Sequence, residues 1–151
     1  MTTALQTFEA TLPAVPTPVA NYVPWVQVGD LLYTSGTLPM KDGQLAFTGQ
    51  LTDDSSIVQG HDAAQLACLN ALSVVKSALG SLTRVERVVK LTGFVSSDPA
   101  FTDQPLVLNG ASDLLVEVFG DAGRHSRSAV GVASLPKNAS VELELIIQIK
   151  Q

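Results

Sequence analysis

The sequence predicts an α+β domain in which a mixed β-sheet carries two helices on one of its faces. Residues 141–150 alternate between apolar and polar side chains, which is the pattern of a half-buried strand. Residues 57–79 instead repeat apolar side chains at steps of three and four, which is the pattern of an amphipathic helix. Strand-like and helical segments follow one another along the chain. Two helices packed on one face of a single sheet satisfy this order.

The chain, at 151 residues, fits one domain spanning 1–151. Its first 18 residues are proline-rich and only loosely patterned. Within them, residues 8–12 alternate in a way that is compatible with part of an edge strand. No internal repeat or second domain is indicated.

The next elements are predicted to be a hairpin and a loop. Apolar runs at 25–28 and 31–35 flank Gly29-Asp30, which is a two-residue turn signal. Residues 37–54 are polar and contain glycine turns, so we expect a loop there.

The first long helix is predicted to end at Gly80, and Asp53 with the serines that follow supplies its N-terminal cap. His61 and Cys68 lie on its apolar stripe. We interpret both as packed side chains, because cysteine is commonly buried and the two lack further partners at metal-ligand spacing.

The second half predicts a strand at 85–95 and a helix at 100–120, in which Asn109-Gly110 interrupts the helical pattern. Residues 127–133 and 141–150 then predict a C-terminal hairpin joined by a proline-containing connector.

Arg127 is the first candidate functional residue. It heads a strand face of very small side chains, which includes Ala129, and we expect open space around its guanidinium. The sheet face opposite the helices is predicted to hold Arg127 and Glu142, and to face water or line an interface. From the residues alone, the two charges form either a ligand site or a structural ion pair. Arg124 and His125 form an anion site with Arg127 or a solvated turn, and we favour the turn.

Composition limits the partners. Hydrophobic residues make up 46% of the chain and charged residues only 15%, which suggests apolar surface buried between subunits. The net charge of −5 and the scattered basic residues argue against nucleic acid. The lone Cys68 fits a reducing compartment. We see no signal peptide and no apolar run long enough to span a membrane, and we expect a soluble, cytoplasmic protein.

The segment 127–137, followed by Val-Glu-Leu-Glu at 141–144, resembles the C-terminal signature of the Rid family, the reactive intermediate deaminases. This family is also called YjgF-like or endoribonuclease L-PSP. Gly29 and Thr34-Ser35-Gly36 resemble its N-terminal signature. Residues 109–115 and 119–127 are similar to its longer, chorismate-mutase-like branch.

The resemblance implies a homotrimer whose sheets form an inner barrel, with helices outside and pockets in the clefts between subunits. Well-studied members hydrolyse enamines and imines to 2-keto acids and ammonia. For this chain the resemblance implies a 2-iminobutanoate/2-iminopropanoate deaminase-like hydrolase that acts on a small carboxylate substrate without metal or cofactor. The alternative is a non-catalytic protein that binds or senses a small carboxylate such as a keto acid. Ribonuclease activity fits the acidic balance poorly.

The site residues follow from the same resemblance. Arg127 matches the arginine that grips the substrate carboxylate, and Glu142 matches an acid that positions water and passes a proton. Tyr22 matches a pocket tyrosine, and Ser35 with Gly36 matches a pocket-lining strand end. Asn109 matches a pocket asparagine. Whether Arg127 and Glu142 meet within one subunit or across two stays open.

Two departures from the family pattern concern this pocket. The Gly-Pro pair that usually precedes the tyrosine is Ala20-Asn21 here. A cysteine common two residues after the arginine is Ala129, which removes thiol chemistry at that position.

Overall fold

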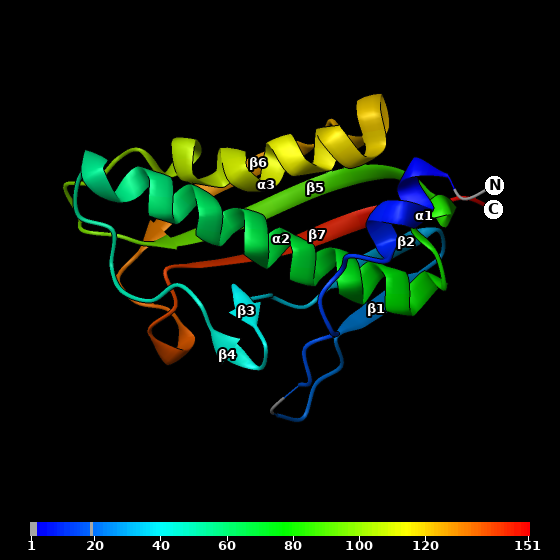
Figure 1. The fold of residues 1–151 in the computed structure, drawn as a ribbon, viewed down its shortest axis with the longest axis horizontal. Coiled ribbons are helices and arrows are strands. Elements are labelled where there is room, and N and C mark those ends of the chain that lie inside the picture. Colours follow the sequence, from blue (N-terminus) through cyan, green and yellow to red (C-terminus); the bar gives the residue numbers. More distant parts are fainter. Residues whose placement is uncertain (1–2, 19) are drawn as a thin grey trace.

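The computed structural model contains a five-stranded mixed sheet that carries two long helices on one face (Figure 1). The structure describes residues 3–18 and 20–151. Strand order is β1–β2–β7–β5–β6, with only β5 and β6 parallel. The strands are β1 (Trp25–Val28), β2 (Leu31–Thr34), β5 (Val85–Ser96), β6 (Ser126–Val132) and β7 (Val141–Ile149). The helices are α2 (Ile57–Leu79) and α3 (Gln104–Phe119). The predicted fold class is confirmed.

The two C-terminal strands do not form a hairpin, and that prediction is wrong. β5 lies between them, antiparallel to β7 with Val95 opposite Val141, and parallel to β6 with Leu91 opposite Arg127. A strand, a helix and a returning strand place the two strands side by side and parallel, and β5–α3–β6 is such a unit. β6 is therefore an outer strand of the sheet, and β7 is an inner one.

The sheet buries the face that the alternation predicted. The apolar side chains of β7 on the helix side are all buried. They are Val141, Leu143, Leu145, Ile147 and Ile149. Cys68 lies in the same core, where burial raises the pKa of its thiol to about 12, so its packed interpretation is confirmed. His61 does not follow its prediction, because its side chain is 40% exposed beside Asp62.

The N-terminal segment contains a helix rather than the edge strand suggested by its alternation. Thr3 and Gln6 form a reciprocal capping box that starts α1 (Ala4–Glu9). The buried side chain of Glu9 accepts hydrogen bonds from Ser81 Oγ, at 2.8 Å, and from the Leu82 amide. The segment then crosses α2, where Ser73 Oγ donates to the Pro13 carbonyl at 2.8 Å. These bonds fasten the chain ahead of β1 to the rest of the domain.

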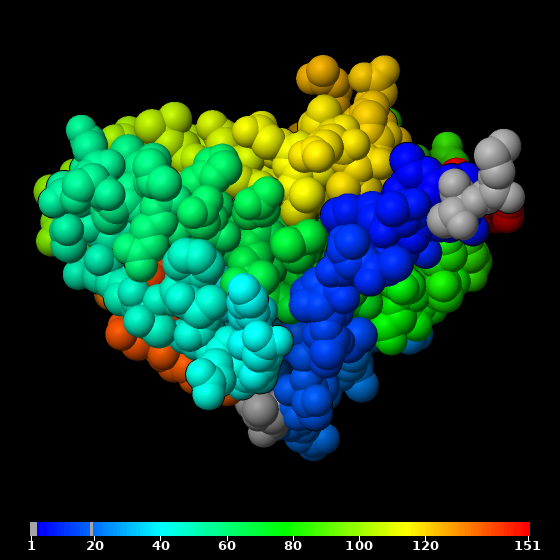
Figure 2. All heavy atoms as spheres, viewed as in Figure 1, coloured from blue at the N-terminus to red at the C-terminus, as the bar shows by residue number. Residues whose placement is uncertain are grey.

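The polar loop predicted at 37–54 contains a small hairpin of β3 (Met40–Lys41) and β4 (Gln44–Leu45). Its two turn residues, Asp42 and Gly43, both have positive φ, as a tight hairpin turn requires. Figure 2 shows this hairpin, in cyan, and the blue N-terminal segment on the same side of the molecule as α2.

Gly110 explains why an Asn-Gly pair stands inside α3. A Cβ added at Gly110 would collide with the His61 carbonyl of α2, so the glycine allows the two helices to approach closely. At Gly60, on α2, an added Cβ would meet only side chains, those of Leu51 and Val107. Gly110 thus packs against main-chain atoms, which move little, whereas Gly60 packs against side chains, which can change rotamer.

We expect Gly110→Ala to lower the free energy of unfolding by about 1–3 kcal/mol, because backbone must shift to admit the methyl group. Gly60→Ala is the matched control, since it makes the same gain in helix propensity of about 1 kcal/mol while only side chains must yield. Urea unfolding of both variants measures the difference. An equal or greater loss for Gly60→Ala would contradict this account of the helix contact.

Candidate functional site

The end of β2 departs from regular pairing at the residues predicted to line a pocket. Tyr33 pairs with Ile146, and the next bridge joins Thr37 to Leu143, so residues 34–36 face only residues 144–145. The hydroxyl of Thr34 accepts the Leu145 amide hydrogen at 2.9 Å in place of a main-chain acceptor. One extra residue on one strand is a β-bulge, and bulges change the direction of the bulged strand. This one sets Ser35 and Gly36 apart from the ladder.

Gly36 lies directly against Glu142. A Cβ added at Gly36 would collide with Glu142 Oε1 and lie 3.0 Å from its Cδ, so a larger residue would require this carboxyl to move. The Glu142 side chain is about half buried. Burial, and then the negative charge of Glu144, raise the pKa of Glu142 above its usual value. A carboxyl in this condition holds and releases a proton closer to neutral pH than an ordinary glutamate.

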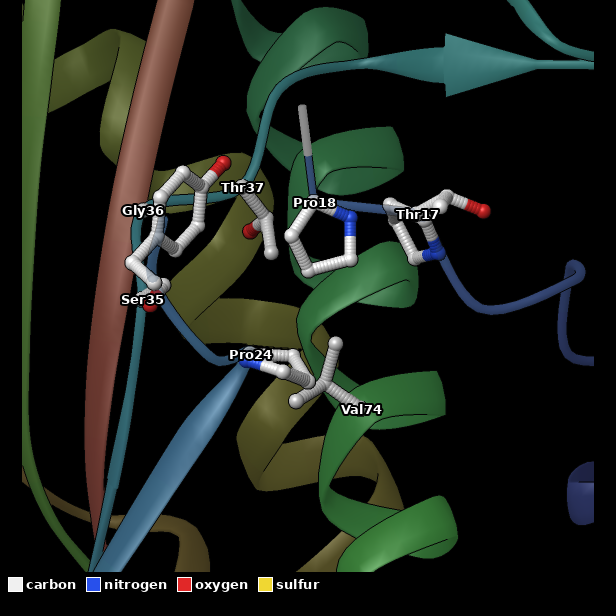
Figure 3. Close-up of a pocket in the computed structure, with 9 residues that line it drawn as sticks. Thr17, Pro18, Pro24, Ser35, Gly36, Thr37 and Val74 are labelled. Atoms are coloured by element: carbon white, nitrogen blue, oxygen red, sulfur yellow. The ribbon is translucent and has the colours of Figure 1, made fainter. Parts of the chain in front are cut away.

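Tyr22 and Ser35 complete the pocket around Gly36. Figure 3 shows the small pocket in which Ser35, Gly36 and Thr37 face Pro18 and Thr17 of the N-terminal segment. Tyr22 also lines it. Ser35 is fixed by its amide, which donates to the Pro24 carbonyl at 2.9 Å, and by its hydroxyl, which donates to Val23.

This pocket adjoins a larger groove of about 1060 Å³. The groove runs between the N-terminal segment and the β3–β4 hairpin, over α2, and Tyr22, Gly36 and Glu142 line it. Four of the six predicted site residues, Tyr22, Ser35, Gly36 and Glu142, therefore gather at one place.

Arg127 and Asn109 gather at a second place, on the helix side of β6. The Arg127 Nη1 donates to Asn109 Oδ1 at 2.9 Å and to Ser112 Oγ at 3.1 Å. Its Nη2 donates to the Pro105 carbonyl at 3.4 Å. The prediction that Arg127 shares the open sheet face with Glu142 is wrong.

The expected open space around Arg127 is also absent, because α3 covers the face of small residues. A Cβ added at Gly131 would lie 2.7 Å from both Gln104 Nε2 and Ser97 Oγ. The small side chains of β6 thus allow a helix to approach rather than a ligand.

The Arg127 guanidinium nevertheless keeps unused donors. Of its five N–H groups, three are committed to Asn109, Ser112 and Pro105. Nε–H and one Nη2–H have no acceptor within residues 3–18 and 20–151. Nε and Nη2 share one edge of the guanidinium, and such an edge can bind a carboxylate through two parallel hydrogen bonds.

Arg127 and Glu142 do not form an ion pair within the chain, and they cannot share one ligand there. β5 separates β6 from β7, which places the two strands about 10 Å apart. Arg127 aligns with Leu91 and Leu145, whereas Glu142 aligns with Phe94 and Val130. The Arg127 side chain faces α3, and Glu142 points to the opposite sheet face. Each chain therefore carries two separate halves of the predicted site.

Two further residues lie at the second place: Ser112, which was not identified from the sequence, and His125, for which a solvated turn was favoured over an anion site. The Ser112 hydroxyl lies 2.9 Å from His125 Nε2, and His125 Nδ1 lies 2.6 Å from the Gly123 carbonyl oxygen. The predicted solvated turn holds for Arg124, whose exposed side chain lies 3.4 Å from Asp121, but not for the half-buried His125. Helical spacing of Asn109 and Ser112 could have revealed that both share one face of α3.

Metal ligands are not clustered in this part of the molecule. Across residues 3–18 and 20–151, no three His, Cys, Asp or Glu side chains come together as a metal site requires. Over the same ranges, no helix is both long and apolar enough to cross a bilayer.

The fold and these residues define a small α+β domain of one family. Residues 3–149 match the family model described as "YjgF/chorismate_mutase-like, putative endoribonuclease". The chain belongs to this family, which is the Rid family that the signatures indicated.

Individual relatives cover nearly the whole chain. A Trypanosoma cruzi protein named TCP17 is 47% identical, over 96% of this chain and 91% of that one. A 2-iminobutanoate/2-iminopropanoate deaminase of Dermatophagoides farinae is 34% identical, over 91% of this chain and 93% of that one. A crystal structure of an Agrobacterium tumefaciens protein of unknown function is 49% identical, with a TM-score of 0.88, covering 97% of this chain and 90% of that one.

Proposed function

We propose that this protein hydrolyses small 2-imino or 2-enamino acids to 2-keto acids and ammonia, at sites formed between the subunits of a homotrimer. One observation carries the proposal: each chain holds two complementary half-sites that it cannot join by itself. One half offers an arginine edge that fits a carboxylate. The other offers Glu142, with its raised pKa, beside Gly36 in a groove. A neighbouring chain that brings its own Arg127 to this groove completes the site.

Association is supported by the sheet face that the helices leave uncovered. It is part apolar, and Val28 there is 64% exposed and Val26 51%. The register puts further apolar side chains on the same face, namely Tyr33, Phe94, Val130 and Ile146. Exposed apolar surface of this kind marks an interaction site, and a closed ring of identical chains would bury it.

In the proposed reaction, Arg127 of one subunit binds the substrate carboxylate and fixes the adjacent imine carbon near Glu142 of the next subunit. Glu142, ionised, takes a proton from a water molecule while the water oxygen bonds to the imine carbon. The substrate reacts as its iminium form, so this addition gives a neutral tetrahedral carbinolamine. Glu142 then passes its proton to the amine nitrogen. The C–N bond breaks as Glu142 takes the proton of the new hydroxyl group, which forms the carbonyl of the 2-keto acid and releases ammonia, and Glu142 then loses this proton to solvent. Water is the sole co-reactant.

The remaining residues would position the substrate. The backbone of Ser35 and Gly36 borders the groove beside Glu142, where its polar groups can orient the substrate. Tyr22 is half exposed at the same place and can cover the substrate once it is bound. Asn109 holds one end of the Arg127 guanidinium.

The test is ammonia release from 2-iminobutanoate generated in the assay from threonine by a pyridoxal-phosphate dehydratase. We expect the protein to accelerate release, and Arg127→Ala to lower kcat/KM by on the order of 10²-fold, because a charge-assisted bidentate contact is lost. Arg124→Ala is the matched control, since this arginine is exposed and lies outside both half-sites. No acceleration by the unaltered protein would overturn the proposal. Calorimetric binding of 2-oxobutanoate without catalysis would instead select the carboxylate-binding alternative.

A further inference from the structure

The group of side chains around Arg127 contains a chain of hydrogen bonds that the proposed reaction does not yet use. It starts at the Gly123 carbonyl oxygen, continues through His125 and Ser112, and ends at Arg127 Nη1. The successive donor–acceptor distances are 2.6, 2.9 and 3.1 Å.

The direction of each bond follows from the chemistry of the atoms. A carbonyl oxygen only accepts, so His125 Nδ1 must carry a proton to bond to Gly123. In a neutral imidazole the other nitrogen, Nε2, is then an acceptor, and the Ser112 hydroxyl donates to it. The serine oxygen keeps its lone pairs for the Arg127 N–H. Every member therefore has one defined role.

We propose that His125 and Ser112 form a relay that holds the Arg127 guanidinium in the orientation required for carboxylate binding. This inference rests on the proposed function, because it assigns His125 and Ser112 as positioning residues for the carboxylate of the same substrate. Arginine has a long side chain whose rotamer freedom costs free energy to restrain on binding. A guanidinium already fixed at Nη1 presents its Nε–Nη2 edge to the ligand in advance, which improves affinity by lowering that cost.

The place of Arg127 on an outer strand beside α3 supports this role. β6 is an outer strand, so Arg127 has β-sheet on only one side. On the helix side, Asn109 and Ser112 of α3 both accept from Nη1, which occupies both of its hydrogens. Asn109 acts alone, whereas Ser112 is itself oriented by His125. The 3₁₀ turn Gly120–Gly123, which follows α3, supplies the carbonyl that orients His125.

The Ser112–His125 pair also has the spacing of a nucleophile and its base, and this alternative is testable. The Arg127 N–H bonds to the serine oxygen that would have to attack a substrate. An oxygen whose lone pair is engaged by a cation is a poorer nucleophile, so the geometry favours positioning. We expect a fluorophosphonate probe to leave Ser112 unlabelled, and labelling of Ser112 would overturn the relay.

The experiment compares four variants of the full-length protein. Ser112→Ala removes one of the three acceptors of the Arg127 guanidinium. His125→Phe keeps a ring but has no nitrogen, and His125→Gln keeps an acceptor within reach of Ser112. Ser126→Ala is the control, because this serine lies next to His125 but donates to Val89 outside the relay.

We expect Ser112→Ala and His125→Phe to weaken calorimetric binding of 2-oxobutanoate, and to raise KM, by about tenfold, the usual scale for one hydrogen bond to a charged group. We expect kcat to change by less than about twofold, because a positioning residue acts on binding of the carboxylate rather than on proton transfer. His125→Gln should recover most of the affinity, and Ser126→Ala should match the unaltered protein. Loss of affinity with His125→Gln equal to that with His125→Phe would overturn the relay.

A ligand-free measurement separates this inference from the proposed function. In the unaltered protein, the two Nη groups of Arg127 should give distinct side-chain NMR signals, because hydrogen bonds slow rotation of the guanidinium. Ser112→Ala should speed the rotation, because only the contacts to Asn109 and Pro105 remain. An unchanged rotation rate would overturn the relay even if the protein is a deaminase. Faster rotation in a protein that binds no 2-oxobutanoate would support the relay and reject the proposed function.

Discussion

Replacing Glu142 with glutamine is expected to slow ammonia release from 2-iminobutanoate by about 10²- to 10⁴-fold, the usual contribution of a general acid–base group. Glutamine keeps the size of the side chain against Gly36 but can neither take a proton from water nor return it to nitrogen. Because Arg127 provides the carboxylate contact, affinity for 2-oxobutanoate should change little. Steady-state rates together with calorimetry measure both quantities. A variant that retains more than about a tenth of the activity would remove Glu142 from the proton transfers.

The same variant should not be less stable than the unaltered protein. The folded-state pKa of Glu142 is raised, so the folded chain binds this proton more tightly than the unfolded chain. The stability that results is fully present below the unfolded pKa and is lost as the pH rises through the folded pKa. At neutral pH a half-buried charge remains, and Glu142→Gln removes it. We therefore expect a higher Tm with lower activity, which excludes misfolding as the cause of the loss.

The pH dependence of activity offers a control on the neighbouring charge. If Glu142 acts as a base when ionised, the acid limb of kcat/KM follows its pKa and lies above that of an ordinary glutamate. Glu144→Gln removes the like charge that contributes to this rise, so the acid limb should move to lower pH while the maximum is maintained. An acid limb that stays in place would assign the titration to another group.

The sequence was a good guide to individual elements because their causes are local. The 3.6-residue repeat and Gly80 predicted α2 nearly to its ends, and the alternation along 141–150 predicted which side of β7 is buried. Strand pairing was not local. β6 and β7 follow one another in the chain, but β5 separates them in the sheet, and the chain pattern of 127–150 contains nothing about a third strand.

The error at Arg127 has a separate cause. Small side chains on one face of a strand are equally compatible with open space and with a helix packed closely over them. In the structure α3 packs over this face: Gln104 lies close to Gly131, and Asn109 and Ser112 accept hydrogen bonds from Arg127. Four of the six candidate site residues lie around Gly36, and Arg127 with Asn109 lies elsewhere. This separation into two half-sites depends on three-dimensional topology that single-sequence patterns do not encode.

Mixing Arg127→Ala chains with Glu142→Gln chains should restore activity that neither variant has alone. If each site takes Arg127 from one chain and Glu142 from its neighbour, random assembly of an equal mixture leaves about one quarter of the sites with both residues intact, because each is supplied independently. If both residues came from the same chain, every chain would lack one of them and the mixture would be inactive. Their placement on opposite sheet faces, on strands separated by β5, argues for the first outcome.

The measurement is ammonia release after the two variants are unfolded and refolded together, with native mass spectrometry to count the chains and their distribution. The variants refolded separately and then combined provide the control, since exchange of subunits is needed for the effect. Restoration only in the co-refolded sample would place the site between subunits. A co-refolded trimer of mixed chains without activity would show that one chain must supply both groups. The chain would then have to rearrange to bring Arg127 and Glu142 together, because the structure holds them apart.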